Sequence, residues 1–109
     1  MLDVADHGSE VRVTVTGTRI DAAIAISFKD KLREIVLSNR KPVVLDMRSV
    51  DFMDSSGLGA VIAVRKAMPA GLPLTLEGLT PNVERVFRLT RMDSVFEIRR
   101  ATSEGQETI

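Results

Sequence analysis

The 109-residue chain contains no cysteine, one histidine and no net charge. The absence of cysteine excludes disulfides and thiol chemistry and fits a reducing compartment. Because acidic and basic residues balance, nothing attracts the chain in bulk to nucleic acid or acidic lipid, and we expect no direct nucleic-acid partner. With one histidine, neither a nitrogen or sulfur metal site nor a serine–histidine–aspartate triad has support.

Long apolar runs are also missing. No stretch approaches the roughly 20 apolar residues of a membrane span, so we expect no membrane span. The N-terminus, MLDVADHGSE, has acids where a secretory signal needs a basic start, and this favours a cytoplasmic location. The length suits a single hydrophobic core. We expect one domain over residues 1–100 and a polar C-terminal tail, ATSEGQETI, over residues 101–109.

Hydrophobic periodicity predicts strands and helices in alternation. Strands are expected at residues 2–5, 10–17, 42–47, 74–79 and 94–100, and helices at 22–38, 57–68 and 80–92. Asp21 is the expected N-cap of the first helix, and Thr80 and Pro81 are expected to begin the third. Strands separated by helices imply right-handed crossovers. The sequence therefore predicts an α/β domain in which helices pack on a mainly parallel sheet with one antiparallel edge strand.

The segment DSSGLG, residues 54–59, lies where a buried strand gives way to a helix. Functional groups in parallel sheets gather at such carboxyl ends of strands. Asp54, Ser55 and Ser56 are also common helix caps, and the segment alone favours capping without regulation. Neither serine has the flanking glycines of a nucleophile elbow, and no phosphate-binding loop is present. We expect no catalytic residue and no cofactor.

Two charged clusters have simple structural explanations. Asp46, Asp51 and Asp54 could in principle hold magnesium, but a polar turn and a helix start explain them better. Arginines recur every three residues on the third predicted helix, at positions 85, 88 and 91. A solvated helix face is a better explanation for these arginines than a phosphate-binding stripe.

Residues 43–67, VVLDMRSVDFMDSSGLGAVIAVRKA, and the later segment TPNVERVFRLTRMDSVFEI together resemble the STAS domain of bacterial anti-sigma factor antagonists. The resemblance covers roughly residues 10 to 99, most of a domain-sized chain. The DSSGLG junction and the P-x-V-x-R-x-F helix carry it most specifically. Family members commonly have Gly-Glu-Leu-Asp after the early strand, whereas this chain has GTRIDAA, in which Asp21 takes the place of the aspartate.

This resemblance implies a binding module and not an enzyme. Unphosphorylated members bind an anti-sigma factor that is also a serine kinase, which releases a sigma factor. Phosphorylation of the first serine after the aspartate, here Ser55, ends the interaction, and a PP2C-type phosphatase restores it. The expected partner-binding residues are Asp21, Asp54, Ser56, Gly57 and Leu58.

Two other hypotheses stay open at this point. The chain could be a non-switching STAS subunit of a signalling scaffold or of a lipid-transport complex. It could also be a small-ligand or nucleotide sensor that uses the same junction.

Overall fold

Strands and helices alternate along residues 1–100, the part of the chain that the computed structural model describes. The strands are β1 (Leu2–Asp6), β2 (Val11–Val15), β3 (Arg19–Ile20), β4 (Val43–Asp46), β5 (Phe52–Met53), β6 (Leu74–Glu77) and β7 (Glu97–Arg99). The helices are α1 (Ala25–Asn39), α2 (Ser55–Ala67) and α3 (Pro81–Leu89), and a short 3₁₀ helix covers Met92–Ser94. The tail expected at residues 101–109 lies outside the described range.

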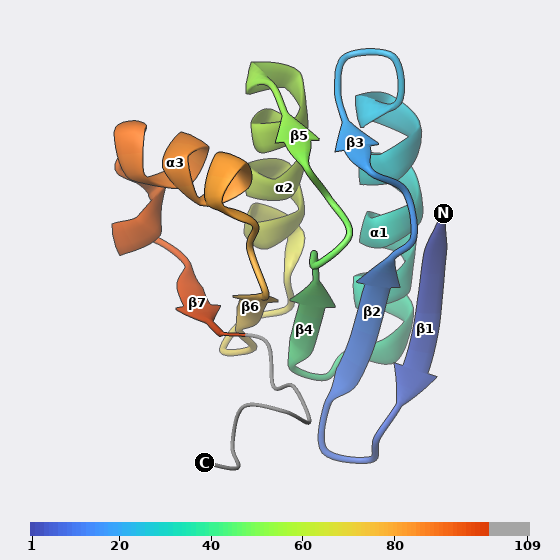
Figure 1. Cartoon of the computed structure of the whole chain (residues 1–109). Coiled ribbons are helices and arrows are strands. Elements are labelled where there is room, and N and C mark those ends of the chain that lie inside the picture. The colour runs from blue at the N-terminus through green and yellow to red at the C-terminus, as the bar shows by residue number, and fades with distance from the viewer. Residues whose placement is uncertain (101–109) are drawn as a thin grey trace, which may run out of the picture.

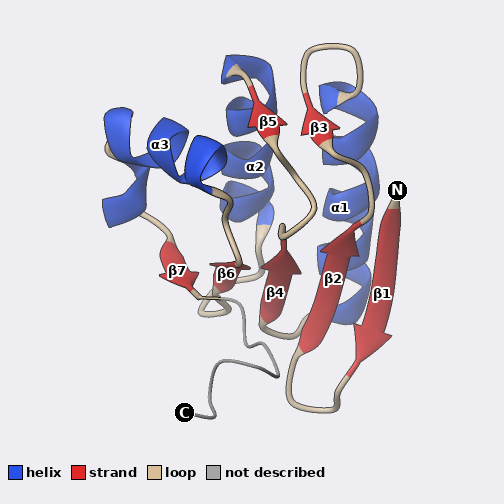
Figure 2. Ribbon diagram, viewed as in Figure 1, coloured by secondary structure: helices blue, strands red, loops and turns tan. Residues whose placement is uncertain are grey.

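The main sheet has the order β1-β2-β4-β6-β7. Strand β1 pairs antiparallel with β2, and the other neighbours are parallel, which confirms the predicted mixed sheet with its antiparallel edge. Helices α1 and α2 lie side by side behind this sheet (Figure 1). Helix α3 lies beyond the ends of β6 and β7, next to β5 (Figure 2). The predicted α/β architecture is therefore present.

The core lies between the sheet and helices α1 and α2. Strand β2 alternates, and its three valines, Val11, Val13 and Val15, are no more than 1% exposed. Helix α1 places Phe28, Leu32 and Val36 on one buried face because their spacing follows the helical repeat. Burial of each such side chain stabilises the fold by about 1.5–3 kcal/mol. This packing fixes the position of both helices on the sheet.

The opposite face of the sheet carries a line of charges. Asp46 on β4 and Glu77 on β6 are register partners, and they are only 1% and 3% exposed. Arg12 on β2 bridges them, with Nη2 2.8 Å from a Glu77 oxygen and Nη1 3.4 Å from an Asp46 oxygen. Arg48 also donates to Asp46, at 2.9 Å. Buried carboxylates are tolerated here because guanidinium groups neutralise them.

Two predicted helix starts differ from the structure. Asp21 is not the N-cap of α1, because Ile24 occupies that position and makes no side-chain cap hydrogen bond. The Asp21 carboxylate instead accepts a hydrogen bond from the Ala23 amide, which creates a turn before the helix. Helix α2 begins at Ser55, earlier than the predicted residue 57.

The third helix begins as predicted, with Thr80 at the N-cap position and Pro81 following it. The Thr80 hydroxyl makes no cap hydrogen bond and donates to the Val50 carbonyl at 2.8 Å. This contact ties the start of α3 to the loop between β4 and β5.

Strands β3 and β5 were not predicted. They pair in parallel over two residues each, outside the main sheet. Segments this short give no periodic signal in a sequence.

No helix within residues 1–100 is long and apolar enough to cross a membrane.

Candidate functional site

The junction between β5 and α2 places Asp54 at the N-cap of the helix. One Asp54 oxygen accepts the Gly57 amide at 3.0 Å, within the first turn of α2. The other accepts the Ala22 amide at 3.1 Å, from the turn between β3 and α1. The carboxylate therefore caps α2 and also joins it to a turn that is 32 residues away in the chain.

Hydrogen bonding keeps this carboxylate ionised. The Gly57 amide lowers the pKa of Asp54 below its ordinary value, and the Ala22 and Ser56 amides lower it further, while loss of water opposes the shift. A negative charge also suits a helix N-terminus, where backbone amides point outward without partners.

Ser55 and Ser56 are exposed in the first turn of α2. Neither hydroxyl makes a hydrogen bond to another group within residues 1–100. The sequence allows Asp54, Ser55 or Ser56 to cap α2. In the structure Asp54 alone does so. The two serine hydroxyls are therefore open to solvent and to another protein.

Gly57 and Leu58 are buried, in contrast to the serines that precede them. A Cβ atom on Gly57 would overlap the backbone carbonyl of Ile20, so only glycine allows α2 to approach β3 this closely. Leu58 is 7% exposed and belongs to the hydrophobic core. Both residues hold the helix start in place.

Asp21 lies next to this junction, although it does not cap α1. Its carboxylate accepts the Ala23 amide at 3.1 Å and pairs with Arg19, also at 3.1 Å. Ala22, the next residue, donates to Asp54. The structure thus brings Asp21, Asp54, Ser55 and Ser56 to one end of the molecule.

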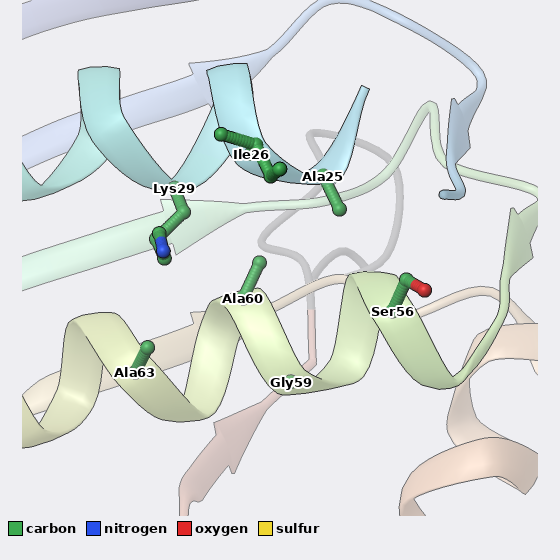
Figure 3. A pocket seen from close by; sticks show the side chains of 7 residues that line it. All are labelled: Ala25, Ile26, Lys29, Ser56, Gly59, Ala60 and Ala63. Carbon is green, nitrogen blue, oxygen red and sulfur yellow. The ribbon is translucent and has the colours of Figure 1, made fainter. Parts of the chain in front are cut away.

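A groove of about 260 Å³ lies between α1 and α2 beside the serines. Figure 3 shows Ser56 at one end of it and Lys29 of α1 reaching toward α2. Its lining is otherwise apolar or small: Ala25, Ile26, Gly59, Ala60 and Ala63. Ile26 is 70% exposed, so an apolar side chain borders the site.

The aspartates considered for a metal site have separate structural roles. Asp46 is paired with Arg12 and Arg48 on the sheet, whereas Asp54 caps α2. Within residues 1–100, no group of three histidine, aspartate or glutamate side chains could hold a metal ion. Arg85 and Arg88 are exposed on α3.

The sequence profile of the STAS domain matches residues 2–105. The chain belongs to the STAS domain family. The anti-sigma-B factor antagonist of Listeria monocytogenes is 29% identical to this STAS domain over 100 residues, which are 91% of this chain and 84% of that protein.

Solved structures share the fold. An anti-sigma factor antagonist from Mycobacterium paratuberculosis has a TM-score of 0.81 at 24% identity, over 91% of this chain and 84% of that one. The phosphorylated form of the Bacillus protein SpoIIAA has a TM-score of 0.69 at 19% identity, over 95% of this chain and 94% of that one. The predicted membership of the STAS family is confirmed.

The sequence analysis missed two exposed residues beside the site, Arg19 and Phe52. They lie opposite each other on β3 and β5, with the Arg19 guanidinium carbon 4.5 Å from the centre of the Phe52 ring. The sequence held no usable signal for this pair, because TRID and DFMD are too short to assign a strand and do not alternate polar and apolar residues.

Proposed function

We propose that this STAS domain is an anti-sigma factor antagonist controlled by phosphorylation of Ser55. In its unphosphorylated form it binds an anti-sigma factor that is also a serine kinase. That kinase transfers a phosphoryl group from ATP to the Ser55 hydroxyl and releases ADP. A PP2C-type phosphatase then removes the phosphate by hydrolysis and restores binding.

The observation that carries this proposal is the division of roles between Asp54 and Ser55. Asp54 supplies the cap of α2, and the exposed Ser55 hydroxyl has no hydrogen-bond partner within residues 1–100. A serine that capped the helix would lose a stabilising bond on modification. Ser55 can be modified without that loss.

Phosphorylation is expected to leave the fold unchanged. The helix N-terminus favours an anion by about 0.3–1 kcal/mol, and the adjacent Asp54 charge opposes it on a similar scale. At an interface the balance differs, because a like charge about 4 Å away costs about 4 kcal/mol at an effective dielectric of about 20. Such a cost corresponds to roughly a thousandfold loss of affinity. The switch is thus electrostatic exclusion of the partner.

The proposed contact residues act in two ways. Asp21, Asp54 and Ser56 line the surface around Ser55 and would touch the partner. Gly57 and Leu58 are buried and would support that surface from beneath. The relatives named anti-sigma factor antagonists support the partner class, and the phosphorylated SpoIIAA structure supports the modification.

The test begins with the protein isolated from its native cells through a chromosomal affinity tag. Intact-mass spectrometry with peptide mapping, before and after phosphatase treatment, measures the occupancy of each serine. We expect phosphate on Ser55, its loss in Ser55→Ala and its retention in the control Ser38→Ala, an exposed serine late in α1. Absence of phosphate in every growth phase and stress condition would favour the scaffold or transport-complex hypothesis. Thermal shifts with nucleotides test the sensor hypothesis.

A further inference from the structure

Strands β3 and β5 present a polar-aromatic pair on the outside of the molecule. Within each strand one residue faces the core, and Ile20 and Met53 are 0% and 4% exposed. The other residue of each strand, Arg19 and Phe52, faces outward. Both strands lie at the end of the molecule where α2 begins (Figure 1).

Two contacts hold the Arg19 guanidinium in place, but its terminal nitrogens have no hydrogen-bond partner within residues 1–100. Its carbon lies 4.5 Å from the centre of the Phe52 ring, and its Nε donates to Asp21 at 3.1 Å. The terminal nitrogens, Nη1 and Nη2, make no hydrogen bond to any group within residues 1–100. The Arg19 side chain is 59% exposed and Phe52 is 41% exposed. A planar guanidinium edge with two free terminal nitrogens therefore faces solvent.

A second arginine–phenylalanine pair in the domain differs in exposure. The Arg65 guanidinium lies 5.6 Å from the centre of the Phe96 ring, and Phe96 is 4% exposed. Arg65 covers a ring that belongs to the core. Phe52, by contrast, remains 41% exposed beside Arg19 and lies outside the hydrophobic core. Aromatic residues and arginine are the residue types most enriched at protein interfaces and among their energetic hot spots.

We propose that Arg19 and Phe52 determine partner specificity, and that the free edge of the Arg19 guanidinium binds a carboxylate of the partner protein. The proposal rests on the proposed function, since that partner is the anti-sigma factor. Phe52 is separated from Ser55 only by Met53 and Asp54, so a protein that covers Ser55 also reaches this pair.

The chemistry of the site selects a carboxylate as the group bound. A guanidinium edge matches the two oxygens of a carboxylate or a phosphate. Asp21 contacts the same guanidinium, and Asp54 is joined to the neighbouring Ala22. A singly charged carboxylate meets less repulsion from these aspartates than a doubly charged phosphate does. Asp21 thus orients the Arg19 guanidinium and also disfavours the binding of a doubly charged phosphate there.

The first experiment identifies the partner and measures its dependence on Arg19. Immobilised wild-type chain, Arg19→Glu and the control Arg65→Ala are each exposed to native-cell lysate, and retained proteins are quantified by mass spectrometry. The protein retained by the wild-type chain is then purified and titrated by calorimetry. We expect about tenfold weaker binding for Arg19→Ala and for Phe52→Ala, and about a hundredfold for Arg19→Glu. Arg65→Ala should bind within about twofold of wild type.

The second experiment locates the carboxylate. Carbodiimide and glycine ethyl ester label accessible aspartates and glutamates of the purified partner, free and in complex. We expect at least one partner carboxylate to be protected by the wild-type chain and labelled in the complex with Arg19→Ala. Unchanged binding by the Arg19 variants, or protection that does not depend on Arg19, overturns the proposal.

The two proposals fail in different ways. If a partner depends on Arg19 but Ser55 is never phosphorylated, the phosphorylation switch is wrong and the specificity pair stands. If Ser55 is phosphorylated by a kinase that binds Arg19→Glu as well as wild type, the specificity pair is wrong and the switch stands. If the wild-type chain retains no protein specifically, both are wrong.

Discussion

Gly57 lies directly against the backbone carbonyl of Ile20, at a separation that leaves no room for a Cβ atom. The contact joins the first turn of α2 to β3, and so joins the proposed phosphorylation site to the turn that carries Asp21. A side chain at Gly57 would have to displace backbone, which relaxes far less than a side chain does. The geometry of the site therefore depends on one glycine.

Gly57→Ala should destabilise the domain by about 3 kcal/mol or more, because the added methyl group overlaps a backbone atom. For a domain of this size we expect the melting temperature to fall by roughly 12 °C or more. Gly59→Ala is the matched control, since a Cβ there meets no atom within 4 Å. Helix propensity should stabilise that variant by up to about 1 kcal/mol. Equal melting temperatures for the two variants would contradict the packing described.

Ser55→Glu should weaken binding of the partner by up to about a thousandfold, for the electrostatic reason given above. The melting temperature should stay within about 3 °C of wild type, because the helix N-terminus and Asp54 have opposing effects. Ser38→Glu, an exposed serine late in α1, provides the control for added charge and should bind as wild type. Calorimetric titration and thermal denaturation measure the two effects separately. Unfolding of Ser55→Glu would refute electrostatic exclusion as the mechanism.

Arg12→Met should destabilise the domain by about 1–3 kcal/mol, because it removes a shared donor from the buried carboxylates of Asp46 and Glu77. Lys41→Met, which removes the partner of the exposed Asp6, should have a much smaller effect. Urea denaturation with a common slope gives both differences. If the two variants lose the same stability, the line of charges on the sheet contributes no more than a surface ion pair.

Asp54 should make stability depend on pH at the acid end. Its pKa is lowered in the folded state, chiefly by the Gly57 amide, while in the unfolded chain it is near 3.9. The folded state therefore binds fewer protons, and this contribution is present above about pH 4 and is lost as pH falls through the lowered pKa. Asp54→Asn should be less stable at pH 7 and should lose less stability on acidification.

Asp6 provides the comparison for that experiment. Its pKa is lowered as well, first by the Gly8 amide and then by Lys41. Asp6→Asn should remove its own part of the acid dependence and leave the part due to Asp54, so that the double variant has the flattest profile. Urea denaturation at a series of pH values between about 2 and 7 gives these profiles. A single Asp54→Asn profile that parallels wild type would show that the cap does not titrate as described.

The α/β architecture and the place of the site were determined by local patterns in the sequence. Three patterns indicate which faces are buried: the alternating valines of β2, the helical spacing of Phe28, Leu32 and Val36, and the apolar run of β4. Helices between strands then require a mainly parallel sheet, with DSSG at the carboxyl end of a strand. Burial and chain connectivity are enough to predict these features.

Which residues meet was decided only by the tertiary structure. The sequence offered three caps for α2; in the structure Asp54 is the cap, and its other oxygen accepts the amide of Ala22, which lies in another turn. The Arg19–Phe52 pair and the bridge from Arg12 to Asp46 and Glu77 likewise join residues more than 30 positions apart. Periodicity reports whether a side chain is buried but not what it contacts, because contacts follow from strand order and register. The fold could therefore be predicted from the sequence, whereas the contacts around Ser55 could not.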